Sequence, residues 1–103
     1  MMHFYKELYL SPDIRNTGRL KRKLRMGSGS LNLYVLSLND EGKRLEFFHN
    51  GILKQKVLHD RDINVVGLAS GRDECIDLIM KIVEEAHEAT GAYDAYAYLK
   101  GER

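Results

Sequence analysis

The sequence predicts an α+β fold, a two-layer sandwich in which two helices pack on one face of a mainly antiparallel sheet of about four to six strands. Three observations lead to this expectation. Residues 11–25 and 70–90 have the apolar spacing of helices that cover a sheet. Short apolar runs of strand length lie before and between them. The chain of 103 residues is long enough for one domain, residues 1–103, built around one core.

The first helix is expected to follow a strand over residues 4–10. Ser11 can cap this helix, Pro12 suits its first turn and Gly27 is a candidate C-terminal cap. Ile14, Leu20 and neighbouring apolar positions share one face. The other side is basic, with Lys21 at the edge of the apolar face; its six cations are Arg15, Arg19, Lys21, Arg22, Lys23 and Arg25.

The middle of the chain predicts a meander of strands. Residues 31–38 are nearly all apolar, which indicates a strand buried on both faces or nearly so. After a turn at residues 39–42, the segments 44–48 and 52–58 flank Asn50-Gly51, a strong hairpin signal. A three-residue loop at 49–51 would pair Phe47 with Leu53 and Glu46 with Lys54, which makes Phe47 part of the core. Residues 63–69 predict a further strand.

The second helix is expected over residues 70–90, with Ser70 as its cap and Thr90-Gly91 as its end. Its apolar arc faces the sheet and its acidic back faces water. The arc comprises Cys75, Ile76, Leu78, Ile79, Ile82, Val83, Ala86 and Ala89, and the back carries Asp73, Asp77, Glu84 and Glu88. Residues 93–99 predict either a last strand or a short helical turn.

The order of elements resembles a ferredoxin-like fold with an inserted hairpin. Residues 11–90 also resemble the helix, three strands, helix order of double-stranded RNA-binding domains. The chain departs from that order by an extra strand at 63–69. It also carries Asp73 and Glu74 where such domains place lysines for phosphate. Both resemblances are topological, so neither implies a function.

Charge is the most informative feature for partners. The net charge is only +1, but residues 1–30 hold seven cations and two acids, a net +5, against −4 for the rest. We therefore predict a non-enzymatic binding or assembly module that contacts nucleic acid or another polyanion, such as an acidic protein, through the basic helix. The alternative is a solvated helix face, or one that faces the acidic second helix across a groove or in a homodimer. Lys54 and Lys56 could protect a sheet edge.

A second candidate site is the strand-to-helix loop, whose backbone N–H groups could hold an anionic ligand of a small-ligand-binding domain or small enzyme. Its residues are Gly67, Ser70, Gly71 and Arg72. The loop lacks the Lys-Ser/Thr pair of a phosphate-binding P-loop, and Asp73 and Glu74 would repel an anion. No nucleophile, base and orienting group can be placed together, so we assign no catalytic residue and no cofactor.

The remaining chemistry-bearing residues predict structural roles. His59, Asp60 and Asp62 indicate a solvated turn, and no set of ligands for a metal converges. The single cysteine, Cys75, falls in the apolar arc and is expected to be buried. The tyrosines at 93, 96 and 98 are expected to pack at the core or, alternatively, to form an adhesive patch. With no membrane-spanning run and no secretion signal, a cytoplasmic location is expected.

Overall fold

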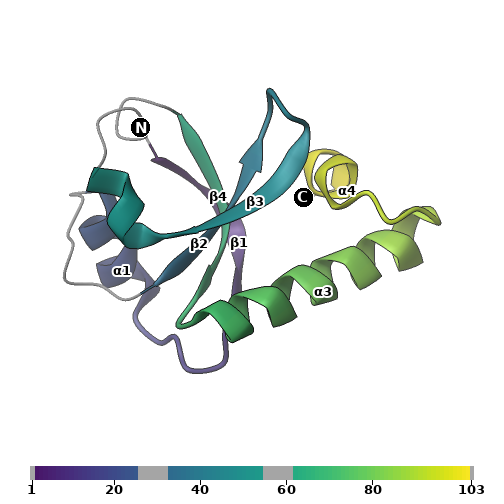
Figure 1. The fold of residues 1–103 in the computed structure, drawn as a ribbon. Helices are drawn as coiled ribbons and strands as arrows, with labels where there is room; N and C mark the ends of the chain where they lie inside the picture. Colours follow the sequence, from purple (N-terminus) through teal and green to yellow (C-terminus); the bar gives the residue numbers. More distant parts are fainter. Residues whose placement is uncertain (1, 26–32, 55–61, 103) are drawn as a thin grey trace.

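The computed structural model describes residues 2–25, 33–54 and 62–102. The fold is α+β, with helices packed against one sheet (Figure 1). In chain order its elements are β1 (Met2–Leu10), α1 (Thr17–Arg25), β2 (Tyr34–Asn39), β3 (Arg44–His49), the 3-10 helix η1 (Asn50–Lys54), β4 (Ile63–Ala69), α3 (Arg72–Thr90) and α4 (Ala95–Glu102). Among these residues no helix is long and apolar enough to cross a membrane.

The described sheet has four strands in the order β1-β4-β2-β3. β2 pairs antiparallel with both β3 and β4, whereas β1 pairs parallel with β4. The sheet is therefore mixed, and the expectation of a mainly antiparallel sheet is wrong. The parallel pair requires a long crossover, and the segment that contains α1, β2 and β3 supplies it.

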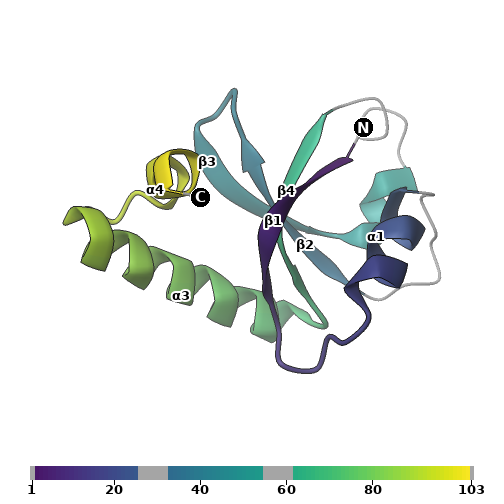
Figure 2. The ribbon, with the colours of Figure 1, turned by 180° about the vertical axis from the view of Figure 1, so that it is seen from behind.

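The two central strands, β2 and β4, are apolar on both faces because their buried side chains alternate between two separate clusters. Leu36 and Val66 belong to the cluster under α3 and α4, whereas Val35 and Val65 belong to the cluster under α1. The sheet and the α3–α4 layer form a two-layer arrangement. The expectation that both predicted helices pack on one face is wrong, because α1 lies on the opposite face of the sheet from α3 (Figures 1 and 2).

The predicted hairpin after β3 is wrong in its described part. Phe47 and Glu46 pair with Leu36 and Ser37 of β2, and Asn50–Lys54 forms η1 instead of beginning a partner strand. Residues 55–58, and with them Lys56, lie outside the described residues. Phe47 is 37% exposed and not a core residue.

Asn50 closes this end of the sheet with its side chain. It is 2% exposed, its Oδ1 accepts the N–H of Leu33 at 3.0 Å, and its own N–H donates to the carbonyl of Leu33 at 2.8 Å. Asn50, which indicates a tight turn in the sequence, is therefore a buried residue that links the end of β3 to the start of β2.

The two helices expected over residues 11–25 and 70–90 both begin later than the sequence predicts. The Ser11-Pro12 segment precedes α1, which is capped by Asn16, whose Oδ1 accepts the N–H of Arg19 at 3.1 Å. Ser70 does not cap α3; the cap residue is Gly71, without a side-chain hydrogen bond. The predicted end of α3 is confirmed, since Gly91 has φ 82° and its N–H donates to the carbonyl of His87 at 2.8 Å.

The helical alternative for the C-terminal segment is confirmed, and α4 is held against the sheet by Asp40 in the β2–β3 turn. Tyr96 donates its hydroxyl to Asp40 at 2.7 Å, and the Nζ of Lys100 lies 3.2 Å from the same carboxylate. These two hydrogen bonds, first that of Tyr96, lower the pKa of Asp40. Leu99 of α4 is fully buried in the cluster under α3.

Replacement of Asn50 by alanine should lower the free energy of unfolding by about 1 to 3 kcal/mol, because it leaves the N–H of Leu33 without that partner. Urea unfolding measures this loss. Asn64→Ala is the matched control, since its amide makes a longer bond of 3.4 Å at the surface, and its cost should stay within about 0.5 kcal/mol. Equal costs for the two variants would contradict the bridging role of Asn50.

Candidate functional site

The orientation of α1 is set by its apolar side chains. Leu24 is 3% exposed and packs on Val35 and Leu68, with Leu20 beside it. A helix of nine residues is marginal in water by itself, so this packing holds α1 in place. Because side chains recur every 3.6 residues, the cations of α1 point away from the sheet or along the flanks of the helix.

The structure divides the six predicted cations into two groups. Lys21 and Arg25 lie on the flank that faces β1, where the Nζ of Lys21 is 5.6 Å and the guanidinium carbon of Arg25 is 4.9 Å from the ring centre of Phe4. Both distances are in the range of cation–π contacts. The contact with Phe4 is a feature that sequence reasoning missed, because the alternation of β1 does not reveal which helix will cover it.

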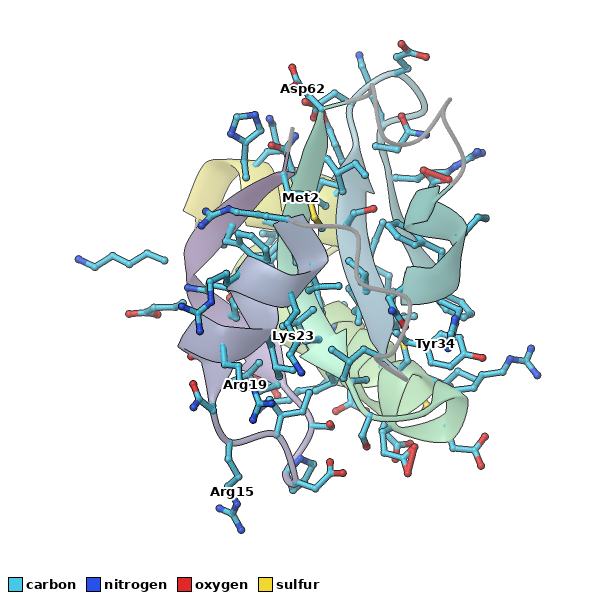
Figure 3. The ribbon with its side chains drawn as sticks, turned by 90° about the vertical axis from the view of Figure 1, so that its left-hand side faces the viewer. Met2, Arg15, Arg19, Lys23, Tyr34 and Asp62 are labelled. Carbon is cyan, nitrogen blue, oxygen red and sulfur yellow. The ribbon has the colours of Figure 1, made fainter. Side chains whose placement is uncertain are left out.

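The other four cations form what we call the α1 basic row: Arg15, which lies just before α1, and Arg19, Arg22 and Lys23 within it. Figure 3 shows Arg19 and Lys23 on α1, and Arg15 on the segment that leads into the helix. Within the described parts of the chain, none of the four forms an ion pair. The row therefore presents positive charge that no described carboxylate neutralises by direct contact.

This arrangement suits phosphate groups better than bases. Cations on a helix surface can neutralise phosphates without a fixed geometry, whereas a base needs an accessible aromatic face or a groove of fixed donors and acceptors. Phe4, an aromatic ring in contact with α1, is already covered by Lys21 and Arg25 and packs in the α1 cluster.

In the predicted ligand loop, Gly67 is explained by packing. It is buried in β4 opposite Tyr9 of β1, and a Cβ atom there would lie 2.9 Å from the carbonyl oxygen of Tyr9. A glycine at this position allows the two parallel strands to approach.

The rest of the loop is occupied by the chain's own groups. The N–H of Ser70 donates to the Oγ of Ser11 at 3.1 Å, and a Cβ on Gly71 would come within 2.6 Å of a carboxylate oxygen of Glu74. Glu74 thus lies over the N-terminus of α3, where the helix dipole favours negative charge. Arg72 is exposed. The ligand-binding role of the four loop residues stays a prediction, and an anion would compete with Glu74.

Asp13 joins the two loops that follow the parallel strands. Its Oδ1 accepts the hydroxyl of Ser70 at 2.9 Å and that of Ser11 at 3.0 Å. These two hydrogen bonds, first that of Ser70, lower the pKa of Asp13 below its ordinary value of 3.8. The three side chains therefore form a clamp that ties the β1–α1 loop to the start of α3.

Metal-ligating side chains do not converge in the part of the chain that the structure describes. His3 lies 3.6 Å from Asp62, and the ring of His87 stacks on Tyr93. His59 and Asp60 lie outside the described residues. Cys75 is buried as predicted, and its burial raises the pKa of the thiol to about 11.

The Asp13 clamp predicts a pH-dependent stability. Because the folded-state pKa of Asp13 is lowered, its contribution is present above pH 3.8 and is lost as the pH falls through the folded-state pKa. Asp13→Asn should therefore melt below the wild type at pH 7, and the gap should close at acidic pH. Thermal unfolding between pH 7 and strongly acidic pH measures the gap, with the exposed-site variant Asp77→Asn as control. A gap that does not change with pH would refute the clamp.

Cys75 should react slowly with thiol reagents in the native protein. The thiolate is the reactive species, and a rise in pKa from 9.0 to about 11 lowers its fraction about 100-fold at pH 8. Labelling rates in the presence and absence of denaturant measure the effect. Equal rates in the two conditions would show that the thiol is accessible and ionised in the folded chain.

Among the candidate binding surfaces, the α1 basic row is best supported by its charge and its position. Comparison of the chain with protein-family models, with curated proteins and with solved structures found no match. The function is therefore inferred from the molecule's own residues.

Proposed function

We propose that the protein is a non-enzymatic binding module that contacts the phosphate backbone of nucleic acid through the α1 basic row, Arg15, Arg19, Arg22 and Lys23. The observation that carries this proposal is the absence of ion pairs to these four cations within the described residues, of which Arg15, Arg19 and Arg22 are exposed and Lys23 is half-buried. Unpaired cations in a row raise the local potential that attracts a polyanion.

The separation of charge across the sheet supports the same proposal. The acidic side chains of α3, among them Asp77 and Glu84, are exposed on the opposite side of the sheet from α1. They do not face the basic row across a groove within one chain. Charges held apart in this way leave the basic row available to an external anion.

The same geometry disfavours a homodimer held by α1 of one copy against α3 of the other. A two-fold dimer buries the same patch on both copies. Since α1 and α3 cover opposite faces of the sheet, one interface cannot include both contacts, and head-to-tail association would form open chains. An external polyanion satisfies the basic row without this conflict.

Recognition through phosphates predicts strong salt dependence and little sequence preference. If the four cations each neutralise one phosphate of a duplex, log affinity should fall with log salt at a slope of about −3.6. Affinity should then drop about 150-fold between about 50 and 200 mM salt. Fluorescence anisotropy with labelled duplex DNA, duplex RNA and single strands measures the slope. Tight binding with a slope near zero would contradict the proposal.

Replacement of Arg19, Arg22 and Lys23 by alanine should reduce the magnitude of the salt slope by about 2.7 and leave thermal stability nearly unchanged. A matched control is Lys81→Ala, which removes an exposed cation from α3. The pair Lys21→Gln and Arg25→Gln should lower stability through the lost contacts with Phe4 and affect binding less. Unchanged binding by the triple variant would refute α1 as the contact surface.

A further inference from the structure

A second surface lies at the other side of the molecule, between the start of β3 and the connection from α3 to α4. It is a shallow hollow of about 450 Å³. Lys43 and Arg44 line it from the β2–β3 side, and Tyr93 and Tyr96 line it from the helical side. α4 lies beside β3, and α1 lies across the sheet from it (Figures 1 and 2).

Tyr93 lines this hollow and has a largely exposed aromatic ring. Its ring stacks on the imidazole of His87, with 4.1 Å between ring centres and 6° between planes. The side of the ring toward His87 is covered, yet Tyr93 is 67% exposed, so the other side is open to solvent. An open ring held parallel to a second ring is a platform on which a planar group can continue the stack.

The two cations lie across the hollow from this platform. Lys43 has φ 50°, in the left-handed region that a side chain other than glycine rarely adopts and that carries a cost in stability. Arg44 is largely exposed, and among the described residues its one ion pair joins its guanidinium to the carboxylate of Glu46 at 3.5 Å. The one acid that lines the hollow, Asp94, is directed to α4, because its Oδ1 accepts the N–H of Ala97 at 3.1 Å.

We propose that this hollow binds a nucleotide unit, with the base stacked on the open face of Tyr93 and the phosphate at Lys43 and Arg44. An aromatic face and two cations in one shallow hollow match the planar base and the charged phosphate of such a ligand. The ligand is either a free nucleotide or one unit of a single strand. The inference does not rest on the α1 basic row, because no residue of that row lines the hollow.

Isothermal titration calorimetry with adenosine monophosphate and with a single-stranded adenylate hexamer tests the proposal. Tyr93→Ala should weaken binding about 5- to 100-fold, whereas Tyr93→Phe, which keeps the ring, should bind as the wild type does. Met80→Ala is the control for loss of an exposed apolar side chain of α3, since Met80 is 56% exposed. The affinity of Met80→Ala for both probes should equal that of the wild type.

Lys43→Gly separates binding from folding. Glycine relieves the left-handed backbone, so this variant should melt at a higher temperature while it binds roughly three- to fivefold more weakly. The triple variant of Arg19, Arg22 and Lys23 should bind adenosine monophosphate like the wild type. A loss of binding at the hollow can therefore be distinguished from a loss of binding at the α1 basic row.

The affinities for the two probes show which ligand the hollow binds and whether the proposal holds. Equal affinity for the two probes supports a free nucleotide, and tighter binding of the hexamer supports a unit of a single strand. The proposal would be overturned if neither probe binds at about 1 mM. It would also be overturned if Tyr93→Ala and Met80→Ala weaken the affinity equally.

Discussion

The two central strands are apolar on both faces, and the rest of the structure depends on this property. β2 and β4 bury side chains in two clusters, and each cluster needs a helical layer to exclude water from it. α3 and α4 cover one face and α1 the other. The requirement for cover on both sides places the basic helix and the acidic helix on opposite sides of the molecule.

The parallel pairing of β1 with β4 brings together the segments that follow these strands. The β1–α1 loop and the start of α3 then meet, and Asp13 binds Ser11 and Ser70 across them. The same pairing requires Gly67, because β4 and β1 approach closely there. Residues with the spacing of caps and ligand loops are thus used to join two loops, which explains why α3 begins without a side-chain cap.

The sequence-based predictions are correct where an element depends on residues close together in the chain, and they fail where it depends on contacts between distant residues. The strand at residues 63–69 and the end of α3 at Gly91 agree with the structure, since both depend on local apolar runs and backbone conformation. The hairpin at Asn50-Gly51 is wrong because the amide of Asn50 finds a buried backbone partner 17 residues away. For the candidate site, the six cations were identified from sequence, whereas the division between the α1 basic row and the pair over Phe4 required the fold.

The sequence by itself determined the α+β class, the amphipathic helices and the strong positive charge of the first helix, because periodicity and charge are properties of neighbouring residues. The nearly continuous apolar run at 31–38 also indicated a strand buried on both faces. Only the tertiary structure decided that β1 pairs parallel with β4, that α1 lies across the sheet from α3 and that Tyr93 shares a hollow with Lys43. Local patterns state which side of an element is apolar, but the partner that covers it is selected by the packing of the whole chain.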